Sequence, residues 1–123
     1  YKDKAKTKNI SSPTQLKKLT TDLKKFSTKP LFISIDQEGG KVARLKSKYG
    51  FSKIPSAHEV SKMSFEDTVG VYEIQSSMLE DAEINMNFAP VVDLAVNPKN
   101  RVIVGLERSF GSDIRQVVAF SKV

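Results

Sequence analysis

The chain has 123 residues, of which 39% are hydrophobic and 28% charged, a balance typical of a globular domain and not of a disordered chain. It has no cysteine and one histidine, which excludes disulfides and thiolate metal sites and argues against a histidine-rich metal site. No apolar run approaches the roughly 18 residues of a membrane-spanning helix, and no signal peptide is visible. We therefore expect no metal site and no membrane span.

The net charge of +6 is distributed unevenly along the chain. Residues 1–53 carry fourteen Lys and Arg against four Asp and Glu, whereas residues 54–123 carry six against ten. A basic face of this kind can attract nucleic acid or an anionic membrane surface. However, thirteen of the fourteen cations are lysines without interleaved aromatic side chains, whereas nucleic-acid readers usually carry arginine and stacking residues. We expect a solvated lysine face and no nucleic-acid partner.

The first predicted element is an amphipathic helix. Residues 1–9 have no apolar period and are expected to be poorly ordered. Ser12, Pro13 and Gln15 then match a helix start, with a capping hydroxyl and a proline in the first turn. The apolar side chains at helical spacing are Leu16, Leu19, Leu23 and Phe26.

A short apolar segment, residues 31–35, follows and has the pattern of a strand buried on both faces, as in parallel sheets covered by helices. It stops at the polar residues 36–40, which include Asp36, Glu38 and two glycines. Carboxylates at the C-terminal end of a buried strand are where α/β proteins place their chemistry. This end of the strand is therefore the first candidate for a functional site.

Helix signals return after the loop 42–55. Ser56 and Glu59 form a capping-box pattern before a short helix, and Ser64 starts a longer helix that runs to about Ile84. The apolar positions predicted for the inner face of the longer helix are Val71, Ile74, Met78 and Ala82.

The last third of the chain repeats the strand and helix pattern. Asn85 is a plausible helix stop, and residues 86–92 form a second mostly apolar strand that ends on Asp93. A long loop, 94–111, leads to a final helix opened by Ser112 and Asp113. The side chains predicted to face inward on that helix are Ile114, Val117 and Val118.

The element order, αβαβα with a helix pair in the middle, is the rhythm of a parallel sheet with right-handed crossovers. Two strands do not make a sheet, and a complete (β/α) barrel needs about 250 residues. We expect an α/β fold in which residues 1–123 form a partial (β/α)8 TIM-type barrel, roughly two βα units of a larger domain. Its open sheet edges could pair with a second copy of the chain.

Both predicted strands end in an aspartate, and neighbouring strands of a barrel place their following loops at one mouth. Asp36, Asp93, Arg44 and Arg108 are therefore candidates for a shared polar pocket. Such a pocket suits a sugar, because carboxylates accept hydrogen bonds from hydroxyls and arginine donates several. Aspartates after strands also cap helices or pair with arginine structurally, so spacing alone leaves pocket and scaffold roles open.

Four motifs extend this interpretation: IDQEGGKVARL at residues 35–45, IPSA at 54–57, NFAPVVD at 87–93 and ERSFGSD at 107–113. In this order and spacing they closely resemble the N-terminal catalytic domain of glycoside hydrolase family 3. The run DQEGGxVxR is similar to the β-N-acetylhexosaminidase branch, which trims N-acetylglucosamine in peptidoglycan recycling. The resemblance covers nearly the whole chain from Ile10 onward. It implies a retaining glycosidase without metal or organic cofactor, acting on an N-acetylglucosamine-containing glycan or muropeptide.

The resemblance also implies roles for the four candidates. Asp36, Arg44 and Arg108 match residues that bind the hydroxyls of the sugar in the first subsite, and such anchoring supplies the positioning part of catalysis. Asp93 matches a family aspartate for which sugar contact and loop ordering are both open.

The catalytic groups of the family have no counterpart here. Relatives use an aspartate nucleophile and, in this branch, a histidine acid/base on a mobile loop, and both positions are expected beyond Val123. We therefore expect no catalytic residue in the chain and no activity from it alone. His58 belongs to a helix start and is expected at the surface, and Glu38 is expected in a structural turn.

Other functions stay open at this point. The chain could belong to a non-catalytic carbohydrate-binding or scaffold protein, or to another family 3 glycosidase such as a β-glucosidase, or to a phosphorylase. A basic interaction module is a further class, and a steep loss of affinity with salt would favour it. Both a cytoplasmic and an exported location are compatible with the sequence.

Overall fold

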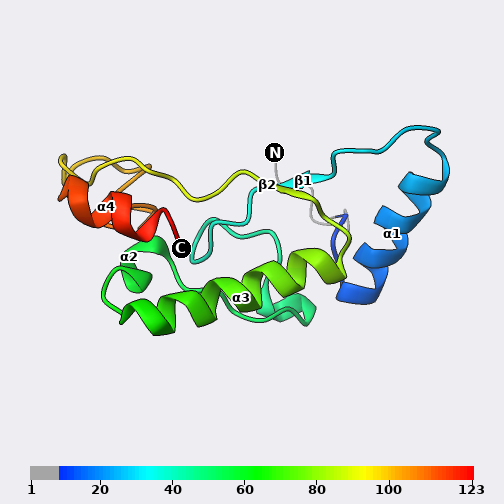
Figure 1. Ribbon diagram of the computed structural model, residues 1–123, viewed down its shortest axis with the longest axis horizontal. Coiled ribbons are helices and arrows are strands. Elements are labelled where there is room, and N and C mark those ends of the chain that lie inside the picture. Colours follow the sequence, from blue (N-terminus) through cyan, green and yellow to red (C-terminus); the bar gives the residue numbers. More distant parts are fainter. Residues whose placement is uncertain (1–8) are drawn as a thin grey trace, which may run out of the picture.

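The computed structural model describes residues 9–123, so the expectation of poor order for the first residues falls almost entirely outside the part described. The elements are α1 (Pro13–Lys25), β1 (Ser34–Ile35), the 3-10 helix η1 (Ser47–Tyr49), α2 (Ala57–Val60), α3 (Phe65–Asp81), β2 (Met86–Asn87) and α4 (Ile114–Phe120). The predicted order of helices and strands is confirmed. Figure 1 shows an elongated arrangement in which α1 and α4 lie at opposite ends and α3 runs beneath the paired strands.

The α1 helix begins as its sequence predicts. The Ser12 hydroxyl accepts a hydrogen bond from the backbone N–H of Gln15 at 3.1 Å, and Pro13 occupies the first turn. Leu16 is buried against the first core cluster, but Leu23 and Phe26 are 46% and 89% exposed. The predicted inner face is therefore wrong for the last turn, because the described contacts at that end of the helix run from Thr21 and Lys24 to Glu83 and not from Leu23 or Phe26.

The two strands are shorter than predicted. They pair in parallel over two residues each, with Ser34 opposite Met86 and Ile35 opposite Asn87. Ile35 is buried, whereas Phe32 is 82% exposed. The prediction of a strand buried on both faces is therefore wrong for the described residues: the core lies on the side of Ile35, and the side of Phe32 has no covering layer.

The first core cluster joins α1, β1 and the end of α3. Its buried members are Leu16, Ile35, Leu45, Phe51, Ala82 and Ile84. Because these residues come from segments spread between positions 16 and 84, the cluster fixes the position of β1 relative to the C-terminal end of α3.

The α2 and α3 helices also begin as predicted. Both halves of the capping box are present in α2, since the Ser56 hydroxyl accepts from the Glu59 N–H and the Glu59 carboxylate accepts from the Ser56 N–H at 2.8 Å. The hydrogen bond from the backbone N–H of Ser56 is the main cause that lowers the pKa of Glu59, and the hydrogen bond with the Ser56 hydroxyl acts in the same direction. Ser64 caps α3.

The inner face of α3 differs from the predicted one at Ile74. Thr68, Gln75 and Ala82, seven residues apart, are buried, whereas Ile74 is 50% exposed. The prediction of Ile74 as an inward residue is therefore wrong, whereas Val71 and Met78 pack against the core clusters as predicted. Asn85 is not the helix stop either: α3 ends at Asp81 with Ala82 as its C-cap.

The second core cluster lies at the opposite end of the molecule and consists of Ala57, Val60, Phe110 and Val117. Asp113 caps α4 as predicted, through a hydrogen bond of 2.7 Å from the Arg115 N–H. Ile114 and Val118 are 65% and 46% exposed, so their predicted inward orientation is wrong. Only the side of this short helix that carries Val117 meets α2.

No helix within residues 9–123 is long and apolar enough to cross a membrane.

We predict that Phe110→Ala destabilises the protein by roughly 3–5 kcal/mol, because it empties a fully buried position. The Phe110 ring also stacks on Phe120 with centroids 5.6 Å apart. The matched control is Phe26→Ala, which removes an 89% exposed ring and should change stability by less than about 0.5 kcal/mol. Urea unfolding of both variants is the measurement, and equal losses would contradict the described core.

Candidate functional site

The candidate site begins in the loop that follows β1. Gly39 and Gly40 both have positive φ, at 97° and 52°. A Cβ on Gly39 would lie 2.1 Å from the Pro55 carbonyl oxygen, and one on Gly40 would lie 2.5 Å from Cβ of Ser56. The loop therefore needs both glycines in order to fold flat against residues 55–56.

The first ion pair of the site joins the two ends of this loop. Nη2 of Arg44 donates to Oδ2 of Asp36 at 2.9 Å, and the two side chains are 53% and 48% exposed. Exposed polar atoms of this kind are available to a ligand, since a carboxylate accepts and a guanidinium donates several hydrogen bonds. The structure thus brings together two of the predicted sugar-binding residues.

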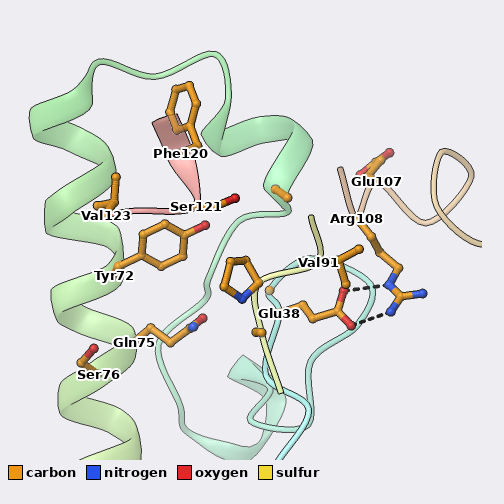
Figure 2. Close-up of a pocket in the computed structure, with 14 residues that line it drawn as sticks. Glu38, Tyr72, Gln75, Ser76, Val91, Glu107, Arg108, Phe120, Ser121 and Val123 are labelled. Atoms are coloured by element: carbon orange, nitrogen blue, oxygen red, sulfur yellow. Dashed lines mark hydrogen bonds and ion pairs between the residues drawn. The ribbon is translucent and has the colours of Figure 1, made fainter. Parts of the chain in front are cut away.

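The second ion pair joins segments that are 70 residues apart. Nε and Nη2 of Arg108 donate to the two carboxylate oxygens of Glu38 at 2.7 and 2.8 Å. This pair is shielded, since the side chains of Arg108 and Glu38 are only 22% and 9% exposed. The bidentate geometry fixes the plane of the guanidinium. Figure 2 shows the pair at the edge of a hollow, with the third guanidinium nitrogen pointing away from Glu38.

Electrostatics around Arg108 connect it to the other candidates. The hydrogen bonding of Arg108 to Glu38, in which the guanidinium donates, is the main cause that raises the pKa of Arg108, and the charges of Asp93 and Asp36 contribute in the same direction. Asp36 and Asp93 therefore lie close enough to Arg108 to act on its charge. Arg108 stays fully protonated.

Asp93 contributes to the site through its backbone. Its carbonyl oxygen accepts a hydrogen bond of 2.6 Å from the hydroxyl of Ser109, which is buried. This contact ties the end of the second strand segment to the ERS motif next to Arg108. The Asp93 side chain is exposed, so both of its predicted roles, sugar contact and loop ordering, stay predictions.

A hollow of about 160 Å³ lies beside the shielded ion pair, between α3, α4 and residues 89–91 (Figure 2). Glu38 and Arg108 line one side of it, and Tyr72 and Gln75 line the opposite side. Burial raises the pKa of Tyr72 to about 12, so its hydroxyl remains protonated.

The four sequence candidates do not share one hollow. Arg108 lines the hollow beside α3, whereas Arg44 lines a separate one of about 100 Å³ with Lys46, Lys48 and Tyr49. The exposed side chain of His58 is not among the residues that line either hollow.

Sequence reasoning missed two residues of this region. It placed Glu38 in a structural turn without a partner, although its charge complements Arg108 in the ERS motif. It assigned no role to Gln37, which is fully buried and whose Oε1 accepts from the N–H groups of Arg44 and Leu45 at 2.9 and 3.0 Å. Its position in the sequence, between the carboxylates Asp36 and Glu38, was the signal that could have drawn attention to Gln37.

Comparison with known proteins identifies the family. Residues 5–123 match the model of the glycosyl hydrolase family 3 N terminal domain. The chain belongs to glycosyl hydrolase family 3. Among curated family members, it is similar to a beta-hexosaminidase of Xylella fastidiosa strain M23, with 30% identity over 122 residues that cover 94% of this chain and 35% of the relative. A beta-hexosaminidase of Tolumonas auensis is 33% identical over 114 residues, which cover 90% and 32%.

Solved structures are similar as well. A beta-N-acetylglucosaminidase from Paenibacillus sp. FPU-7 matches with a TM-score of 0.84 and 36% identity, over 92% of this chain and 22% of that one. A beta-N-acetylhexosaminidase from Beutenbergia cavernae matches with a TM-score of 0.75 and 28% identity, over 95% and 37%. The chain spans about a third of the length of the curated relatives that it matches.

For this family 3 chain we predict that Glu38→Gln destabilises the protein by roughly 2 kcal/mol, because the shielded Arg108 loses its charged partner. The control is Glu107→Gln, which neutralises a carboxylate paired with Lys41 at the surface and should have little effect. Thermal unfolding of both variants at equal ionic strength is the measurement. A larger loss for the Glu107 variant would contradict the described pairing.

Proposed function

We propose that this chain is part of a retaining β-N-acetylhexosaminidase that removes terminal β-linked N-acetylglucosamine from a glycan or muropeptide. Asp36, Arg44 and Arg108 bind the sugar in the first subsite, and Asp93 borders it. The hydrolase names of the curated relatives and of the similar solved structures support the substrate class. The proposed reaction needs no metal and no organic cofactor.

The observation that carries this proposal is the pairing of two arginines with two carboxylates at the end of β1. The Asp36 and Arg44 pair is half exposed and offers both an acceptor and donors to sugar hydroxyls. The Arg108 guanidinium is held by Glu38 in one plane, so little conformational freedom is lost when it meets a ligand. A site that offers both hydrogen-bond acceptors and donors suits the hydroxyls of a sugar ring, since each hydroxyl can donate and accept.

We propose further that the chain contributes two βα units to a (β/α)8 barrel. The parallel pairing of β1 with β2, with α2 and α3 between them, is the connection that such a barrel repeats. In that arrangement the residues that follow β1 and β2 face the same mouth of the barrel, where enzymes of this architecture hold their substrates.

The nucleophile and the general acid are, in this proposal, supplied from outside residues 1–123. Both oxygens of Glu38 already accept hydrogen bonds from Arg108, which leaves that carboxylate poorly placed to attack a sugar. His58 is exposed and lines neither of the two hollows. The chain 1–123 on its own is therefore expected to be inactive.

The test is hydrolysis of a chromogenic N-acetylglucosaminide by the complete gene product and, in parallel, by the chain 1–123. We predict activity in the complete product alone. Asp36→Ala should lower kcat/KM on the order of 10- to 100-fold, because hydrogen bonds to a charged group are lost. The control is Asp22→Ala on α1, which pairs with the neighbouring Lys18 and Lys25 and should leave kcat/KM unchanged.

Three results would overturn parts of this proposal. Activity in the chain 1–123 would place a nucleophile within it. Preference for a β-glucoside would indicate the β-glucosidase branch. Sugar binding by the complete product without hydrolysis would indicate a carbohydrate-binding protein.

A further inference from the structure

Two asparagines, two residues apart, connect the segment of β2 to the segment of β1 by the same chemistry. The Asn85 side chain accepts from the N–H of Ile33 and donates to the carbonyl of Leu31, both at 2.8 Å. The Asn87 side chain accepts from the N–H of Gln37 and donates to the carbonyl of Gln37, both at 3.0 Å. Each asparagine therefore supplies one donor and one acceptor to backbone groups that lie just outside the two-residue strand pair. Asn85 does so at one end of the pair and Asn87 at the other.

The contact of Asn87 continues into the candidate site. Gln37 is fully buried, and its side-chain oxygen accepts from the backbone N–H groups of Arg44 and Leu45. A chain of hydrogen bonds thus runs from Asn87 through Gln37 to the backbone of Arg44. Since Asp36 is the residue before Gln37, both members of the exposed ion pair are held at their backbones by this chain.

The exposed ion pair between Asp36 and Arg44 is too weak to fix the positions of its own side chains. Pairs between exposed side chains contribute only about 0–1 kcal/mol and are screened by salt. Asp36 and Arg44 are about half exposed, so their mutual attraction is weak compared with the buried network beneath them. The positions of the two side chains must be set mainly by the backbone that carries them.

We propose that Asn87 and Gln37 are positioning residues, which hold Asp36 and Arg44 in the arrangement that binds the sugar. This inference rests on the proposed function. Asn85 makes equivalent bonds at the opposite end of β1 and stabilises only the strand pair. The two asparagines therefore form a matched pair of test positions, alike in chemistry and different in distance from the site.

The experiment compares Asn87→Ala, Asn87→Asp and Asn85→Ala in the complete gene product. Melting temperature and the kinetics of hydrolysis of a chromogenic N-acetylglucosaminide are measured for each variant. Asn87→Ala should lower kcat/KM on the order of 10-fold or more, because small misplacements of binding groups cost large factors. Asn85→Ala should lower the melting temperature to a similar extent and leave kcat/KM within about threefold, since it leaves the binding groups in place.

Asn87→Asp keeps an acceptor for the Gln37 N–H and loses the donor to its carbonyl, so its kcat/KM should fall between those of the wild type and of Asn87→Ala. This milder variant keeps the test decisive if Asn87→Ala does not fold. If kcat/KM fell equally in the Asn87 and Asn85 variants, in proportion to their loss of stability alone, the positioning role would be overturned.

A second measurement does not depend on activity. Hydrogen exchange of peptides that cover residues 36–45 should speed up in the Asn87 variants, and exchange of residues 31–35 should speed up in Asn85→Ala. No selective change in residues 36–45 would overturn the inference. An inactive wild type would contradict the proposed function alone, and the exchange result would still decide the role of Asn87.

Discussion

The candidate site depends on one short pairing, the parallel contact between β1 and β2. Only two residues of each strand pair, and the backbone bonds around them include those from the N–H of Phe88 to the carbonyl of Ile35 and from Asn85 to Ile33. Because the strands are parallel, their C-terminal ends lie at the same edge. The loop that follows β1 and the segment that leads to Asp93 therefore start side by side, and the ion pair between Glu38 and Arg108 becomes possible.

The two ion pairs differ in their surroundings and thus in what they can do. Glu38 and Arg108 are shielded and bidentate, so the pair fastens the loop 94–111 to the loop after β1. Asp36 and Arg44 are half exposed and keep free hydrogen-bonding capacity. In the proposed site the shielded pair serves mainly as structure, with one guanidinium edge left for the sugar, and the exposed pair offers most of the polar contact.

Local features of the fold were predictable from the sequence, because they depend on neighbouring residues. The caps at Ser12, Ser56, Ser64 and Asp113 follow from spacing of three or fewer residues, and all are present. Buried faces depend on what packs against them. Ile74, Ile114 and Val118 follow the apolar pattern and are nevertheless exposed, because the described neighbours meet other sides of these helices.

The same distinction applies to the site. Motifs named Asp36, Arg44, Arg108 and Asp93 without a structure. They did not reveal that Glu38 pairs with Arg108 across 70 residues, or that Asn87 reaches the buried Gln37 across 50. Such contacts depend on strand register and loop course, which composition and spacing do not encode.

The central claim is that the end of β1 presents sugar-binding groups at positions set by the paired strands. The most direct measurement is a crystal structure of the complete gene product with N-acetylglucosamine bound. The account predicts sugar hydroxyls within about 3.2 Å of the Asp36 carboxylate and of the Arg44 and Arg108 guanidinium groups. A sugar bound elsewhere, with these three side chains in contact only with protein, would contradict it.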